Sequence, residues 1–193
     1  MDRLMPFDEL NIMDATVRNI FERDRENKRH YLEFLLDEIE EIFILSYIFG
    51  NEAANTMLET DFPPEDAQVT ASVNREVAGK TWRQRVTEYL ENETPDTAEE
   101  IMRVVETDSH RIYNEAMWNV ATRAQDRGIV VYKRWETMLD DRVRDTHAYL
   151  QGEAVPLSEY FFTYDGDFAL RPGDFQFPEN VIGCRCRLVL TRV

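Results

Sequence analysis

The stretch DDRVRDTH at residues 140–147, with GCRC at residues 183–186 downstream of it, governs how the last third of this chain is organised. The two cysteines of the chain, Cys184 and Cys186, stand one residue apart, and His147 closes the charged cluster. Packing alone seldom concentrates ionisable and thiol side chains in this way. We therefore expect the two stretches to form a metal site, a catalytic site or a structural knot.

Composition and charge place the chain among globular proteins with an acidic helical part. It has 193 residues, 43% of them hydrophobic, which is enough for one substantial core. The net charge of −16 is uneven: residues 1–128 carry 28 acids and 14 bases, and residues 129–193 carry 10 acids and 8 bases. The acidic part should repel phosphate backbones, so we expect no direct nucleic-acid binding through it.

We expect neither a targeting signal nor a membrane-spanning segment. Residues 1–10 lack an uninterrupted apolar run, so we expect no secretory signal. The longest apolar run, residues 42–49 (IFILSYIF), is far shorter than the roughly 20 residues of a membrane span, and it predicts deep burial or an oligomer interface. A C-x-C pair makes no useful disulfide framework, so we expect a reducing cytosolic setting with thiols that are free or bind metal.

Apolar spacing predicts about four helices in the first two thirds of the chain. They cover residues 8–27, 28–58, 79–90 and 97–127, with the second stopped by Phe62-Pro63-Pro64 and residues 65–78 as a connection. Thr97 with Glu100 reads as a capping box at the start of the last helix, and Gly128 as its C-terminal cap.

The texture changes after Gly128. β-branched and aromatic runs predict strands at residues 129–135, 160–164 and 187–191, with a short helix or turn over 140–150 that ends at Gly152. The fold class is therefore α+β. An acidic helical region, residues 1–128, precedes a small module, residues 129–193, of short strands and a helix.

The cysteines and the nearby histidine suggest metal binding. Cys184, Cys186 and His147 supply three ligands that suit Zn²⁺, and a fourth could come from Asp145, Asp140 or water. The alternative is a pair of small thiols buried in a strand, without a metal.

The charged cluster has two interpretations of its own. His147 beside Asp140 or Asp145 could act as a general base, as in a metal-dependent hydrolase. Alternatively, the cluster is an ion-pair knot in which Arg142 or Arg144 pins the C-terminal module to the helices, and we favour this interpretation. The sequence contains no nucleophile elbow, zinc-protease, P-loop or dinucleotide-binding motif.

Several blocks in order also carry a family resemblance: GKTWRQR at residues 79–85, RIYNEA at 111–116, YKRWETMLDDRVRDTHAYLQG at 132–152, RPGD at 171–174 and NVIGCRC at 180–186. Over residues 79–186 the chain resembles the phage Mu F-like minor head proteins, the phage head morphogenesis family; residues 1–78 are unmatched. The family pattern is a Trp strand, D-x-R-[VT]-[RC]-x-x-[HC]-x-x-[LH]-x-G and a closing C-R-C. The residues that map onto it are Asp140, Arg142, His147, Gly152, Cys184, Arg185 and Cys186.

The resemblance implies a minor head protein of a tailed phage or prophage. Such a protein would assemble in the host bacterial cytoplasm, reside in the procapsid or virion, and dock on portal or capsid proteins, with a role in DNA packaging or delivery and with self-association open. It requires no cofactor, and Zn²⁺ enters only through the His147, Cys184 and Cys186 cluster. Two alternatives stay open: a metal-dependent hydrolase, and an adaptor for toxin delivery, although we expect no effector after Cys186 here.

Overall fold

The computed structural model describes residues 28–92 and 94–193, so the helix predicted over residues 8–27 lies outside the described residues. The described chain holds six helices and five strands. In chain order they are α2 (Lys28–Leu58), α3 (Asp66–Val73), α4 (Trp82–Glu91), α5 (Thr97–Asp126), β1 (Val131–Glu136), α6 (Asp145–Ala148), β2 (Ala154–Pro156), β3 (Phe161–Phe162), β4 (Phe168–Ala169), α7 (Pro178–Val181) and β5 (Arg187–Arg192).

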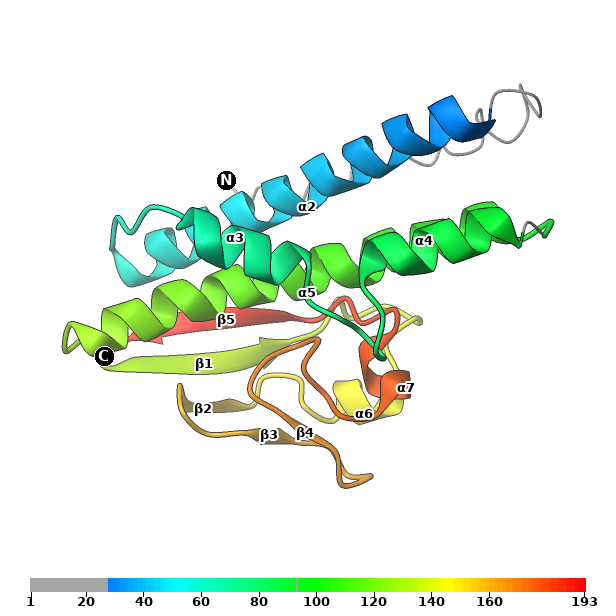
Figure 1. Ribbon diagram of the computed structural model, residues 1–193. Helices are drawn as coiled ribbons and strands as arrows, with labels where there is room; N and C mark the ends of the chain where they lie inside the picture. The colour runs from blue at the N-terminus through cyan, green and yellow to red at the C-terminus, as the bar shows by residue number, and fades with distance from the viewer. Residues whose placement is uncertain (1–27, 93) are drawn as a thin grey trace.

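Two long helices, α2 and α5, lie side by side and form the body of the molecule (Figure 1). Both were predicted, because apolar residues recur along them at helical spacing. Their backbones come close together at Gly50, where an added Cβ would lie 2.3 Å from the carbonyl oxygen of Tyr113. The expected deep burial of residues 42–49 holds for Ile42, Phe43 and Tyr47 but is wrong for Ile44, which is exposed.

The segment between α2 and α5 corrects one expectation and confirms another. Residues 65–78 were predicted to be a connection, yet they contain α3, a short helix whose buried side chains are only Ser72 and Val73 and which therefore shows little periodicity. The predicted helix over residues 79–90 is confirmed as α4. It begins with a capping box in which Thr81 and Gln84 exchange hydrogen bonds.

The ends of α5 show one wrong and one confirmed prediction. Asp96, not Thr97, is the N-cap, and the Thr97 hydroxyl instead accepts a hydrogen bond from the Thr94 N–H, so no Thr97–Glu100 capping box forms. At the other end Gly128 has a φ of 84°, and its N–H donates to the carbonyl of Gln125. With Ile129 bonded to Ala124, this is the Schellman arrangement, which needs a residue that accepts left-handed backbone.

The C-terminal module is built on an antiparallel sheet with strand order β2-β1-β5. The strands predicted near 129–135 and 187–191 are β1 and β5, and they pair over their whole length, with Trp135 opposite Leu188. Figure 1 shows both strands lying beside α5. The strand predicted at 160–164 is confirmed as the two-residue β3, which pairs with β4; β2, β4 and α7 were not predicted.

One core cluster joins both parts of the chain. Side chains from the C-terminal halves of α2 and α5 pack with those of the sheet around Trp135, while a second cluster joins α2, α4 and the first half of α5. The α+β class is thus confirmed, while independent domains at residues 1–128 and 129–193 stay a prediction. Among the described helices none is both long and apolar enough to cross a membrane.

Candidate functional site

The GCRC stretch leads from α7 into β5. Gly183 has a φ of 69°, which turns the chain after α7, and burial then alternates from Cys184 through Cys186 to Leu190. Residues two apart in an extended segment share a face. Both thiols therefore point into the module, where they are buried and form no disulfide.

His147 meets both thiols from the opposite side. It lies on α6, and its Nδ1 atom is 3.6 Å from Sγ of Cys184 and 3.4 Å from Sγ of Cys186. The imidazole stacks on Phe175 at 5.2 Å and meets the Trp135 ring edge-on at 5.4 Å. These contacts fix the ring plane, and the three potential ligand atoms lie within 4.8 Å of one another.

Hydrogen bonds between main-chain groups of the GCRC stretch and side chains of α5 hold the two segments together. The Gly183 N–H donates to Oγ1 of Thr107 over 2.9 Å. Asn114, fully buried, donates from Nδ2 to the Cys186 carbonyl at 2.9 Å and accepts at Oδ1 from the Leu188 N–H at 2.8 Å. One side chain thus replaces a neighbouring strand for this segment.

Arg144, just before α6, provides a second clamp. Its guanidinium donates to the carbonyl oxygen of Ile182 at 2.7 Å and also to that of Glu179. These carbonyls lie at the end of α7, where intrahelical partners run out. Arg144 therefore ties the His147 helix to the turn that carries Cys184 (Figure 1 shows α6 and α7 together at one end of the sheet).

The carboxylates of the charged cluster face away from the imidazole. Asp140 forms a two-pronged ion pair with Arg185 at 2.6 and 2.8 Å, and Arg142 binds Glu106 of α5 at 2.9 Å. Hydrogen bonding from Arg185 lowers the pKa of Asp140. Asp145 is exposed, and no hydrogen bond or ion pair joins either aspartate to His147 within the described ranges. The predicted acid–base partners are thus not brought together, whereas the predicted metal ligands are.

The thiols and a second histidine have shifted pKa values. Hydrogen bonding with Cys186 lowers the pKa of Cys184 well below its ordinary value, and the same bond raises the pKa of Cys186. Burial lowers the pKa of His110 to about 4, so this α5 residue is neutral near pH 7. A thiolate is thus favoured at Cys184, and the nearby His110 is neutral.

Sequence reasoning missed the α5 residues that complete the site, although it noted the RIYNEA block. Within that block Arg111 is buried and pairs with Asp108 at 3.0 Å and with Glu115 at 3.1 Å. Glu115 also faces Arg171, and Arg171 pairs with Asp174 at 3.0 Å, so the RPGD turn is tied to the same network. The signal that could have identified these residues was charged and amide side chains on the otherwise apolar face of a helix.

A buried amine supports the other end of the module. Lys133, on the inner face of β1, donates from Nζ to the Leu170 carbonyl at 2.7 Å and lies 4.7 Å from the Trp118 ring. Burial, with a contribution from Arg171, lowers the pKa of Lys133 to about 7. Its position behind the β3–β4 hairpin is structural, because the side chain has no exposed surface.

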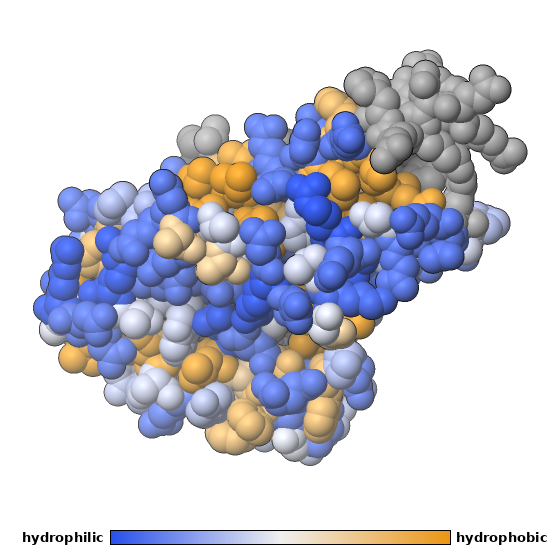
Figure 2. Space-filling view, in the orientation of Figure 1, coloured by the Kyte–Doolittle hydropathy of each residue, from blue (hydrophilic) through white to orange (hydrophobic). Residues whose placement is uncertain are grey.

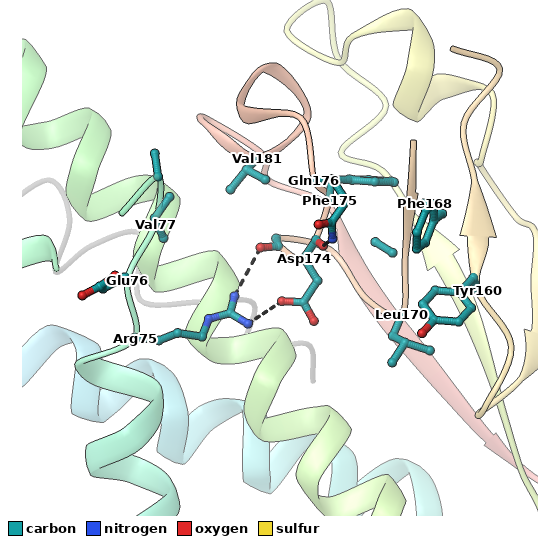
Figure 3. Close-up of a pocket in the computed structure, with 13 residues that line it drawn as sticks. Arg75, Glu76, Val77, Tyr160, Phe168, Leu170, Asp174, Phe175, Gln176 and Val181 are labelled. Atoms are coloured by element: carbon teal, nitrogen blue, oxygen red, sulfur yellow. Dashed lines mark hydrogen bonds and ion pairs between the residues drawn. The ribbon is translucent and has the colours of Figure 1, made fainter. Parts of the chain in front are cut away.

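A cavity of about 430 Å³ lies between the loop before α4 and the RPGD turn. Figure 3 shows Arg75 reaching across it to Asp174 and the main chain beside it, and the ion pair measures 2.6 Å. Phe175 lines this cavity and stacks on His147 with its ring, so the cavity ends at the back of the site. His147 and the two thiols are not among its lining residues.

Comparisons with known proteins identify a family and two relatives. Residues 65–189 match the family described as Phage Mu protein F like protein, and this range contains every site residue named above. The chain is similar to the NAD(+)–arginine ADP-ribosyltransferase EFV of Enterococcus faecalis, at 26% identity over 111 residues. It is also similar to the minor head protein GP7 of Bacillus phage SPP1, at 28% identity over 83 residues. No solved structure matches significantly.

These relatives are much longer than the matched segment. The matches cover 58% and 43% of this chain but only 22% of the transferase and 27% of GP7. The family match extends the resemblance expected over residues 79–186 in both directions and takes in the whole of α3. Because it covers more than half of the chain, the protein belongs to the Phage Mu protein F like family.

Proposed function

We propose that this protein is a minor head protein that acts in head morphogenesis of a tailed phage or prophage and docks on the portal or the inner capsid. The observation that carries the proposal is the family match over residues 65–189, supported by the similarity to GP7 of phage SPP1. The protein would then reside in the procapsid and the virion.

The two relatives together support a docking role over an enzymatic one. One is a head protein and the other an ADP-ribosyltransferase, and each shares only about a quarter of its length with this chain. A chain that matches parts of proteins with such different activities is better suited to a role that both need, such as attachment to a particle, than to transferase chemistry.

The site geometry also favours docking over hydrolysis. A hydrolase using His147 needs an open cleft in which a carboxylate or bound water meets the imidazole. His147 is 2% exposed, and Asp140 is held by Arg185 instead. These residues are arranged to hold the module together.

A surface suited to a protein partner lies on the β3–β4 hairpin. Tyr160, Phe162 and Phe168 are 44%, 59% and 41% exposed, and their rings contact one another, with Tyr160 and Phe168 at 5.2 Å. We call these three residues the hairpin patch; Figure 2 shows pale orange at the lower end of the molecule, where Figure 1 places the hairpin. Aromatic side chains are enriched at protein interfaces, so we assign this patch to the portal or capsid contact.

Any role in DNA packaging or delivery would then pass through the protein partner. The described helices carry most of the acidic excess of the chain, which opposes contact with phosphates. We infer that the protein assists packaging or delivery by its position at the portal.

The test is incorporation into procapsids of the phage or prophage that encodes the protein. We expect the wild-type chain in purified procapsids by mass spectrometry, and a several-fold lower amount of the triple variant Tyr160→Ser/Phe162→Ser/Phe168→Ser. Val130→Ser, which changes one exposed apolar residue outside the hairpin patch, is the matched control and should incorporate normally. Wild-type protein missing from procapsids, together with normal heads after gene deletion, would refute the proposal.

A further inference from the structure

We propose that Cys184, Cys186 and His147 bind one Zn²⁺ ion as a buried structural site that locks the C-terminal module. This inference is independent of the proposed role in the phage head. It rests on the placement of three ligand atoms from two segments that are far apart in the sequence.

The distances fit a tetrahedral ion. With Zn–S bonds of about 2.3 Å and Zn–N bonds of about 2.0 Å, the edges of the tetrahedron are about 3.5 Å between sulfur and nitrogen. The structure has 3.6 Å from Nδ1 of His147 to Cys184 and 3.4 Å to Cys186. Both nitrogen–sulfur edges therefore already suit a bound ion.

A zinc ion accounts for the position of the imidazole more fully than a single S–H hydrogen bond does. A neutral ring nitrogen has one lone pair and accepts one S–H hydrogen bond well. Nδ1 of His147 nevertheless sits at nearly equal distances from both sulfurs. A cation between the three atoms uses the nitrogen lone pair and both thiolates at once.

The protein holds the ligands in place from outside the cluster. Thr107 and Asn114 bind the main chain on either side of Cys184 and Cys186. Arg144 ties α6 to the turn that precedes Cys184. Phe175 and Trp135 fix the imidazole plane. Such support reduces the conformational entropy lost on metal binding.

The ligand set selects zinc, and the burial of the site favours a structural role. Two thiolates and one imidazole suit Zn²⁺, and together with the ion they are electrically neutral, which suits a buried position. Within residues 28–92 and 94–193 no further His, Cys, Asp or Glu joins the group, so a water molecule or a main-chain oxygen would complete the tetrahedron. Burial of all three ligands keeps substrates out.

The experiment measures metal in the reduced full-length chain by elemental analysis and cobalt spectroscopy. We expect close to one Zn²⁺ per chain. After removal of zinc by a chelator, added Co²⁺ should give the thiolate charge-transfer band and the visible bands of a tetrahedral ion. Asp145→Asn changes an exposed carboxylate of the same helix and should keep both signals.

Two variants of His147 test the site while leaving both cysteines in place. His147→Phe preserves ring packing on Phe175 and Trp135 but removes the nitrogen ligand, so zinc content should fall at least several-fold while the circular dichroism stays native. His147→Cys supplies a replacement ligand and should regain the metal. Wild-type chain that is folded and reduced yet binds neither Zn²⁺ nor Co²⁺, or His147→Phe that binds like wild type, would overturn the proposal.

Discussion

Replacement of Asn114 by alanine should destabilise the protein far more than loss of one surface amide. The side chain is fully buried and satisfies two main-chain groups of the neighbouring segment, the Cys186 carbonyl and the Leu188 N–H. Each buried group left without a partner costs about 1–3 kcal/mol, so the two together cost about 2–6 kcal/mol. The variant should therefore lose a large fraction of the stability of an average domain.

The assay is equilibrium unfolding in urea, followed by circular dichroism and by tryptophan fluorescence. Asn119→Ala is the matched control, because it makes the same substitution in the same helix but removes a single bond, from Nδ2 to the Tyr47 hydroxyl at 2.9 Å. We expect about 1 kcal/mol for the control. The helix-propensity change is the same in both variants and cancels in the comparison.

Asn114→Asp sharpens the test. The carboxylate can still accept from the Leu188 N–H, but it places an oxygen against the carbonyls of His110 and Cys186, which Nδ2 now binds at 2.8 and 2.9 Å. We expect it to be at least as unstable as Asn114→Ala at pH 7. If the free energies of unfolding of Asn114→Ala and Asn119→Ala differed by less than about 1 kcal/mol, the hydrogen bonds of Asn114 between α5 and β5 would not provide the predicted stabilisation.

Three further predictions concern the core and its ionisable groups. Gly50→Ala should lose about 1–3 kcal/mol in urea unfolding, although alanine is the better helix former, because its Cβ would meet the Tyr113 carbonyl; a stabilised variant would contradict the close helix contact. Burial raises the pKa of Asp167, but hydrogen bonds from Asn180 and three main-chain N–H groups outweigh it and leave the pKa below 3.8. The stabilisation by the Asp167 carboxylate is thus present above pH 3.8 and lost as the pH falls. The difference in free energy of unfolding between wild type and Asp167→Asn should therefore become smaller in acid, and a constant difference would argue against these hydrogen bonds. The pKa of Lys133 is 10.5 in the unfolded chain and about 7 in the folded protein, so between these pH values the unfolded state binds more protons. The free energy of unfolding of wild type should therefore rise relative to that of Lys133→Met as the pH increases from 7 to 10. Parallel pH dependences of the two free energies would show that the amine is not shifted.

Local patterns in the sequence were sufficient for the long elements. The apolar spacing of α2 and α5 and the β-branched run of β1 specify their conformation because helix and strand periodicities depend on neighbours in the chain. The same patterns placed the α+β boundary at Gly128, whose left-handed backbone ends α5. They failed for α3 and β4, which are short and take their conformation from tertiary contacts.

The residues of the site likewise fall into those that the sequence predicted and those that only the tertiary structure revealed. The residue types of DDRVRDTH and GCRC identified His147, Cys184 and Cys186 as candidate zinc ligands, because thiolate sulfur and imidazole nitrogen suit zinc, and the structure brings these three side chains together. What only the tertiary structure decided is which charges face the cluster and which face away. Asp140 pairs with Arg185 and not with His147. Asn114 and Thr107, which no sequence pattern singled out, hydrogen-bond to the segment that carries Cys184 and Cys186. Hydrogen-bond partners of this kind are set by the packing of α5 against β5, and no pattern of near neighbours in the chain contains that information.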